Sequence, residues 1–280
     1  MNTYTTIAGL KSALQQQRAS GLTIGFVPTM GALHEGHLEL MRRAKKENDL
    51  LVVSIFVNPI QFNNKEDLEK YPRILEADSK MLESVSCDFL FAPAVEEMYP
   101  EPDTTSYDFG ALGDVMEGAF RPGHFNGVAI VVRKLFEITE PHKAYFGEKD
   151  FQQLAIIQQL VKMLQMPVEI VPCAIVREKD GLAMSSRNMR LSPAERALAP
   201  KIHKILKKAA GLKNVLSPEE MRRWVWHELE KEKAFSLDYV EIADDSYLQP
   251  VEHWNDASGM VIFVALFLGK VRLIDNMRIF

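Results

Sequence analysis

Short apolar runs alternate with stretches of helical periodicity over roughly residues 1–175. Runs rich in Val, Ile, Leu and Phe are typical of buried strands, and they cover residues 23–27, 50–57, 88–92, 144–146 and 168–175. Between them, apolar residues recur with the period of a helix at 36–46, 73–84, 128–138 and 149–164. Apolar strands separated by helices predict a parallel sheet covered on both faces, with right-handed crossovers.

The pattern changes after Arg187. Ser192 and Ser217 each precede a proline and an acidic residue, a sequence typical of a helix N-cap. We predict one helical stretch from Ser192 to about Ala210 and another after Ser217. Strand-like runs follow at 237–242, 261–268 and 271–274. We therefore expect an α/β fold with a Rossmann-like parallel sheet over residues 1–183, and a smaller α+β domain over residues 184–280.

Composition and charge narrow the class of protein. The chain has 280 residues, 47% hydrophobic and 25% charged, which is ordinary for a globular protein. Its net charge of −5 disfavours a nucleic-acid partner, although a local basic groove stays open. Two distant cysteines indicate a reducing cytoplasm. The first ten residues lack a signal pattern, and the longest apolar run, 260–268, is too short to span a membrane.

The most informative segment is PTMGALHEGH, residues 28–37, where a predicted strand meets a predicted helix. A helix start exposes backbone N–H groups and the positive end of the helix dipole, which together bind phosphate. His34 and His37 are three residues apart and share one face if this turn is helical. A lone histidine is more often structural, but this pair at a helix start indicates nucleotide chemistry.

Polar residues follow two more predicted strands. Asn58 and Gln61 carry neutral amides that can bind hydroxyls or carboxylates; the alternative is an Asn/Pro-rich turn. Lys149 and Gln153 share a helix face; the alternative is a solvated first turn. Because the carboxyl ends of parallel strands share one edge, we expect segments 28–37, 58–64 and 147–150 to meet there.

Two loops complete the candidate chemistry. In KDGLAMSSRN, residues 179–188, two hydroxyls stand beside Arg187, whose planar fork of donors suits phosphate. The alternative is a polar linker. The segment RPGHFNG, residues 121–127, contains two glycines and a proline, which indicate a loop of defined conformation. In this interpretation Arg121 faces substrate or a partner subunit. The chain has no G-x-x-x-x-G-K-[ST], G-x-G-x-x-G or G-x-S-x-G motif.

These residues carry a resemblance. His34 to His37 resemble the H-x-G-H motif of nucleotidyltransferases and class I-type adenylating enzymes, and Met184 to Arg187 resemble their K-M-S-K-S loop. More specifically, PTMGALHEGH, SIFVNPIQF, RPGHFNGV, YFGEKDFQQ and KDGLAMSSRN occur in the order found in the pantothenate synthetase (pantoate–β-alanine ligase) family. The match spans Pro28 to Asn188, and the second domain rests on analogy.

The resemblance implies an AMP-forming amide ligase of coenzyme A precursor biosynthesis. Pantoate attacks ATP to give pantoyl adenylate and pyrophosphate, and β-alanine then displaces AMP to give pantothenate. The family implies magnesium, a homodimer, a cytoplasmic location, and neither a nucleic-acid nor a membrane partner. The smaller domain is expected to close over the active site.

The resemblance also implies residue roles. His37 is the expected acid, with His34 beside it and Lys149 as a further catalytic residue. Gln61 and Gln153 are expected to hold pantoate, and Gln61 also β-alanine. The metal ligands are unassigned apart from Asp78, a candidate by loose alignment. The expected ATP contacts are Met30, Gly31, Ala32, Leu33, His34, Glu35, Gly36, His37, Gly147, Glu148, Lys149, Asp150, Val176, Met184, Ser185, Ser186 and Arg187.

Three alternatives stay open at this point. A nucleotidyltransferase would keep AMP on its product. An aminoacyl-tRNA synthetase remnant is disfavoured by the acidic charge and the small second domain. A non-catalytic ATP-binding regulator would not need both histidines and Lys149. The proton acceptor for the β-alanine amine is not singled out by the sequence.

Overall fold

A computed structural model of the chain describes residues 1–63 and 65–280. Two compact units divide it. The first unit comprises Met1–Phe109, Arg121–Glu148 and Ile156–Ala174, and the second comprises Gly110–Phe120, Lys149–Ala155 and Ile175–Phe280. Two short segments that precede residue 175 thus belong to the second unit. The division of function between residues 1–183 and 184–280 stays a prediction.

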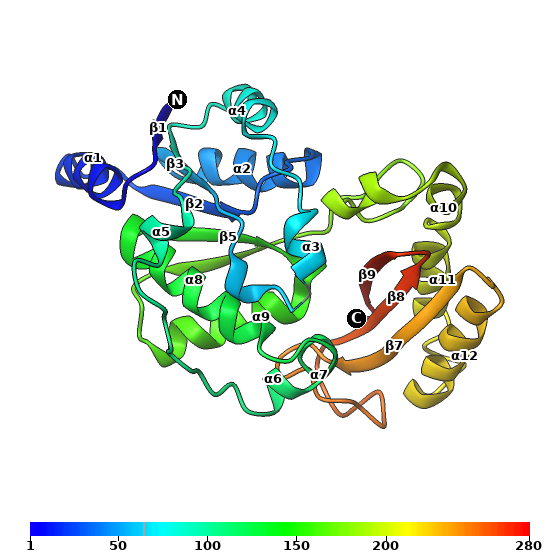
Figure 1. Cartoon of the computed structure of the whole chain (residues 1–280). Coiled ribbons are helices and arrows are strands. Elements are labelled where there is room, and N and C mark those ends of the chain that lie inside the picture. Colours follow the sequence, from blue (N-terminus) through cyan, green and yellow to red (C-terminus); the bar gives the residue numbers. More distant parts are fainter. Residues whose placement is uncertain (64) are drawn as a thin grey trace. The chain divides into compact units, whose positions relative to one another are not determined.

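The first unit contains a six-stranded, fully parallel sheet in the order β1-β4-β3-β2-β5-β6 (Figure 1). All five strands predicted in this part of the sequence are present, and the α/β fold with a Rossmann-like sheet is confirmed. The short edge strand β1 was not predicted. The strands are β1 (Asn2–Tyr4), β2 (Ile24–Thr29), β3 (Leu50–Ile55), β4 (Phe89–Phe91), β5 (Lys143–Gly147) and β6 (Glu169–Cys173).

Helices cover both faces of this sheet, as the apolar strands require. Figure 1 shows α2 and α4 on one face and α8 on the other. The helix α9 (Phe151–Met163) begins in the second unit and ends in the first. The other helices of the first unit are α1 (Ile7–Ala19), α2 (Glu35–Glu47), η1 (Pro59–Gln61), α3 (Lys65–Glu69), α4 (Leu75–Ser84), α5 (Val95–Met98), α8 (His124–Thr139) and η2 (Glu148–Asp150), the last of which also reaches into the second unit.

Alternate residues of the central strands pack into the hydrophobic cores on the two faces of the parallel sheet. Val27 and Val53 pack with Met41 of α2 and Leu82 of α4. The intervening residue Phe26 faces the other way, and its ring meets the ring of Phe136 in α8. Successive side chains on a strand point to opposite faces, so both sides of each central strand are buried.

The strand order reverses direction beside β2. The chain passes from β2 to β3 and β4 on one side, whereas β5 and β6 lie on the other side. In an open parallel sheet, ligands bind at the carboxyl ends of the strands at such a switch point. The segments after β2 and β5, which include Met30 to His37, therefore start from the edge where a ligand is expected.

The second unit contains an antiparallel sheet in the order β7-β8-β9. The predicted small α+β region with three strands is confirmed. The single predicted helix after Ser192 is wrong: it is broken at Ala199 and Pro200. The elements are α6 (Ala111–Asp114), α7 (Glu117–Phe120), η3 (Ser186–Arg190), α10 (Pro193–Leu198), α11 (Lys201–Ala210), α12 (Pro218–Glu230), β7 (Phe235–Asp244), β8 (Met260–Leu268) and β9 (Val271–Arg278).

Both predicted serine caps are present. The Ser192 hydroxyl accepts a hydrogen bond from the Glu195 N–H, and the Glu195 carboxylate accepts one from the Ser192 N–H. Ser217 and Glu220 form the same capping box. Within the described residues, no helix is long and apolar enough to cross a membrane.

Candidate active site

The loop after β2 is held in a strained shape by a buried carboxylate. Gly31 and Ala32 have φ angles of 81° and 50°, so the chain turns sharply before α2. Asp78 of α4 is 1% exposed and accepts hydrogen bonds from the N–H groups of Ala32 (3.0 Å) and Leu33 (2.8 Å). A Cβ on Gly31 would lie 2.9 Å from the Asp78 carboxylate. Only glycine suits both this φ angle and this close approach.

The two histidines stand side by side at the start of α2. His34 is the N-cap, and the ring centroids of His34 and His37 are 4.0 Å apart. The backbone N–H of His34 donates to His37 Nδ1 at 3.3 Å. Because Nδ1 is the acceptor, a neutral His37 carries its proton on Nε2, which is then a donor. The helix start thus sets which nitrogen of His37 can donate.

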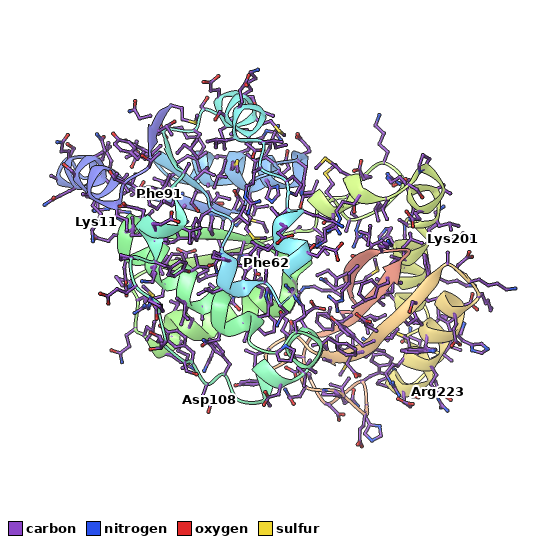
Figure 2. The ribbon with its side chains drawn as sticks, viewed as in Figure 1. Lys11, Phe62, Phe91, Asp108, Lys201 and Arg223 are labelled. Carbon is purple, nitrogen blue, oxygen red and sulfur yellow. The ribbon has the colours of Figure 1, made fainter. Side chains whose placement is uncertain are left out.

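Gln61 lies next to the same loop. Its side chain, in a residue that is 9% exposed, approaches Met30 with 3.0 Å between Nε2 and Sδ, and its Oε1 accepts a hydrogen bond from Asn58 Nδ2 at 3.0 Å. Asn58 in turn accepts from the Tyr99 hydroxyl. Phe62, labelled in Figure 2, directly follows this turn. Segments 28–37 and 58–63 therefore meet as expected, while Asn64 lies outside the described residues.

The segment RPGHFNG supports the Gln61 turn, a role that the sequence did not reveal. His124 is 5% exposed and its Nδ1 lies 2.9 Å from the Gln61 carbonyl oxygen, so Nδ1 must be the donor. A Cβ on Gly127 would lie 2.5 Å from the Ile60 carbonyl oxygen, which lets α8 pack directly against η1. The Gly127 carbonyl also accepts from Asn58 Nδ2. Loops 58–63 and 121–127 form one packed structure.

The segment YFGEKDFQQ crosses from one unit to the other. Gly147 and Glu148 belong to the first unit, and Lys149, Asp150 and Gln153 belong to the second. The Lys149 ammonium lies 3.7 Å from the Asp150 carboxylate, and the Lys149 side chain is 18% exposed. Gln153 is half-buried.

Gln152, the chain neighbour of Gln153, has a structural role that no local pattern indicates. It is 4% exposed and its amide donates to the Leu112 and Val115 carbonyls. Its Oε1 accepts from the Glu117 N–H. The first turn of α9 is therefore fastened to the 110–120 segment within the second unit.

The Met184–Arg187 loop grows from a short hairpin in the second unit. Arg177 pairs with Ala183, and the Met184 N–H donates to the Val176 carbonyl at 3.0 Å. The Ser185 hydroxyl then caps η3 by accepting from the Arg187 N–H. Met184, Ser185, Ser186 and Arg187 are all half-buried.

Residues 2–278 match the protein-family model described as "Pantoate-beta-alanine ligase". The chain is 52% identical over 278 residues to a pantothenate synthetase of Porphyromonas gingivalis, with 99% of each chain covered. A pantothenate synthetase of Bacteroides fragilis is equally similar at 52% identity, again over 99% of both chains. The chain belongs to the pantoate–β-alanine ligase family.

Solved structures of this ligase family agree with the fold. A pantothenate synthetase of Thermus thermophilus matches with a TM-score of 0.94 and 44% identity, over 100% of both chains. A pantoate–β-alanine ligase of Francisella tularensis, described as a complex with β-γ ATP and β-alanine, matches with a TM-score of 0.84 and 38% identity. The match covers 100% of this chain and 98% of the Francisella tularensis chain.

Neither cysteine of this ligase-family chain is placed as a nucleophile. Burial raises the pKa of the Cys87 thiol to about 12, and burial also raises the pKa of Cys173. Both thiols are therefore protonated near neutral pH, and a protonated thiol is a poor nucleophile.

Asp78, the loosely aligned metal candidate, does not fit that role well, because both of its carboxylate oxygens accept backbone N–H groups. Among the described residues, no group of three or more His, Cys, Asp or Glu side chains could hold a metal ion.

Proposed function

We propose that this chain condenses pantoate with β-alanine in two steps that consume ATP. Pantoate first forms pantoyl adenylate and pyrophosphate, and β-alanine then gives pantothenate and AMP. The observation that carries the proposal is the paired His34 and His37 at the start of α2, at the switch point of the sheet, with Gln61 against Met30 of the loop that leads into this helix. The 52% identity to a pantothenate synthetase over 99% of both chains supports it.

In the first step, the start of α2 stabilises charge on the α-phosphate. A pantoate carboxylate is ionised at neutral pH and needs no base to attack. Charge then grows on the phosphate oxygens and on pyrophosphate. His37, with a donor at Nε2, neighbours His34 and the N–H groups of the helix start. Donors already aimed at growing charge are usually the largest catalytic contribution.

Pantoate is held by Gln61 and Gln153 in this proposal. A carboxamide offers both a donor and an acceptor without adding charge where two anions must meet. The Gln61 turn is braced by Asn58 and His124, so its amide is placed before substrate arrives. Gln61 also contacts β-alanine in the second step.

Charged and hydroxyl side chains are assigned to the ATP phosphates in this proposal. Lys149 and Arg187 supply positive charge for the phosphates, and Ser185 and Ser186 supply hydroxyl donors. The full set of proposed ATP contacts is Met30, Gly31, Ala32, Leu33, His34, Glu35, Gly36, His37, Gly147, Glu148, Lys149, Asp150, Val176, Met184, Ser185, Ser186 and Arg187.

Magnesium, a homodimer and a cytoplasmic location are also part of the proposal, and they rest on the family resemblance. Magnesium commonly keeps water and phosphate oxygens as its main ligands, so it enters here with ATP rather than through a protein cage. Sedimentation of the purified chain would report the dimer.

The decisive assay follows the products from ATP, pantoate and magnesium, with and without β-alanine. We expect AMP and pantothenate to appear together, and only when β-alanine is present. A stable adenylylated product would instead indicate the nucleotidyltransferase alternative. ATP binding without β-alanine-dependent AMP release would indicate a regulator and would contradict the proposal.

A further inference from the structure

We propose that Asp275 and Asn276, neighbours on β9, are positioning residues that hold Lys149 and the Met184–Arg187 loop in fixed places within the second unit. The inference rests on the proposed function, because it concerns the two segments assigned to the ATP phosphates. Neither residue belongs to any motif discussed above, and neither is assigned a contact with substrate.

Asn276 fixes the backbone at Lys149. The residue is 5% exposed, and its Nδ2 donates to the Lys149 carbonyl at 3.0 Å. Asn276 pairs with Phe263 of β8, whose ring packs edge-on against Phe151 at 5.5 Å between centroids. The start of α9 is thus docked on β8 and β9 by one polar and one apolar contact. A lysine whose carbonyl is fixed has less freedom in where its ammonium group can reach.

Asp275 fixes the hairpin that leads into the Met184–Arg187 loop. Its two carboxylate oxygens accept from the guanidinium of Arg177 at 2.8 and 3.0 Å, and the Asp275 side chain is only 4% exposed. Arg177 also donates to the Gly181 carbonyl, across the hairpin, and to the Asn276 carbonyl. A bidentate pair of this kind fixes orientation as well as distance. The base of the loop is therefore tied to β9.

The two contacts leave β9 on opposite faces. Val271 and Leu273, which alternate with Asp275, pack in the core with α11 and α12. Arg272, which alternates with Asn276, pairs with Glu117 of α7. Successive side chains on a strand point to opposite faces. One rigid strand therefore sets the distance between two cation-bearing segments that approach it from either side.

This spacing matters because a triphosphate needs its donors in place before it binds. A misplacement of about 1 Å can cost roughly 100-fold in rate. Of the two residues proposed to hold pantoate, Gln61 belongs to the first unit, and Gln153 lies in a turn that Gln152 also holds through Leu112, Val115 and Glu117, independently of β9. Disturbing Asp275 or Asn276 should therefore change how the enzyme handles ATP more than it changes the use of pantoate.

The test measures pantoate-dependent ATP–pyrophosphate exchange by the full chain with magnesium. We expect Asn276→Ala to raise the KM for ATP or lower the exchange kcat by roughly ten-fold, the scale of one lost well-placed hydrogen bond near a charged group. The KM for pantoate should change much less than the ATP parameters. Asn276→Gln keeps the amide and should recover part of the loss. Asp275→Asn, which keeps the shape but removes the charge, should act on the same parameters.

Asn48→Ala is the matched control. Asn48 is 9% exposed, and its amide donates to the Ala44 carbonyl and the Tyr145 hydroxyl in the first unit. Its loss should lower the melting temperature without changing exchange. All variants are assayed well below their melting temperatures.

The possible results distinguish a failure of this inference from a failure of the proposed function. If Asn276→Ala and Asp275→Asn destabilise the protein as Asn48→Ala does but leave the ATP parameters unchanged, the residues are merely structural and the inference is wrong. Equal changes in the KM values for ATP and pantoate would overturn it too. Absence of exchange in the unaltered chain would overturn the proposed function itself. If Asn276→Ala does not fold, Asn276→Gln and Asp275→Asn decide the question by the same parameters.

Discussion

The ring of His37 is oriented by the backbone of α2. Its Nδ1 accepts the N–H of the N-cap residue His34, which leaves Nε2 to donate outward. A histidine in the same sequence outside a helix start would have no such fixed donor. The chemistry proposed for the first step therefore depends on the strand-to-helix junction as much as on the imidazole.

The first prediction concerns this donor. His37→Ala should lower pantoate-dependent ATP–pyrophosphate exchange by roughly 100-fold or more, the scale for one strong catalytic donor. His142→Ala is the control, because His142 Nδ1 also accepts a backbone N–H, from Ile24, but at the opposite end of the strands. Near-normal exchange in His37→Ala would contradict the role of His37.

The second prediction concerns the division of labour at Gln61. Gln61→Ala should weaken pantoate binding by roughly ten-fold or more, since hydrogen bonds to charged groups contribute about 1.5–3 kcal/mol. ATP binding should change little. Calorimetric titration with each ligand separately measures both. Equal weakening of the two ligands would show that Gln61 does not discriminate between them.

Four of the residues proposed from the sequence share one property: each follows a strand of the parallel sheet. His34 and His37 lie at the start of the helix after β2, Gln61 lies in the turn after β3, and Lys149 follows β5. A rule about strand ends is therefore enough to single them out. Asp78, His124 and Asn276 come from helices and from a strand of the other unit, and their roles depend on tertiary contacts that no local pattern encodes.

At the scale of elements, α4 and the loop after β2 depend on one carboxylate. Asp78 satisfies two buried N–H groups in a loop whose φ angles are positive at Gly31 and Ala32. Loops of this shape persist only when their surroundings hold them. The helix α4 thus determines the path by which the chain enters α2.

The third prediction follows. Asp78→Ala should lower the free energy of unfolding by about 2–5 kcal/mol, because each buried donor left unpaired costs about 1–3 kcal/mol. Glu76→Ala, on the same helix, removes an ion pair with Lys80 from a side chain that is 87% exposed, and should cost at most about 0.5 kcal/mol. Denaturant unfolding measures both. Equal losses would mean that Asp78 does not hold the loop.

Among the elements, the strands were easier to predict from the sequence than the break between two consecutive helices. The apolar runs of β2, β3 and β8 are unambiguous because both faces of each are buried. The helix after Ser192 was predicted as one stretch because its apolar spacing continues through Pro200, although that proline begins a new helix, α11. Periodicity cannot distinguish a continuous helix from two that share a face.

At the scale of the whole molecule, the boundary between the two units does not coincide with the change of hydrophobic pattern after Arg187. The 110–120 segment joins the second unit, where Arg272 pairs with Glu117 at 2.7 Å and Tyr239 donates to the same carboxylate. Long-range pairs of this kind connect residues more than a hundred positions apart, so composition along the chain could not reveal them.

The fourth prediction concerns acid stability. Burial and the nearby charge of Arg177 lower the pKa of His203 below its usual value of about 6.5, while Asp275 opposes the shift. The unfolded chain therefore takes up this proton first as the pH falls. Stability should decline below about pH 6.5, because protons bind preferentially to the unfolded state.

Urea unfolding between pH 8 and pH 5 measures this decline. His203→Gln should reduce it, because the titrating group is gone. His227→Gln is the control: that side chain is 79% exposed, and its replacement should leave the pH dependence as in the unaltered chain. If His203→Gln loses stability with acid as steeply as the unaltered chain, His203 does not contribute.

The central claim is that the pantoate carboxylate attacks the α-phosphorus of ATP, and that β-alanine then attacks the pantoyl carbonyl carbon and displaces AMP, which keeps the bridging oxygen. Pantoate labelled with ¹⁸O in its carboxylate tests this directly, by mass spectrometry of the AMP released in a complete reaction. We predict AMP that carries one ¹⁸O atom from pantoate. Unlabelled AMP, or label in inorganic phosphate with release of ADP, would contradict the account.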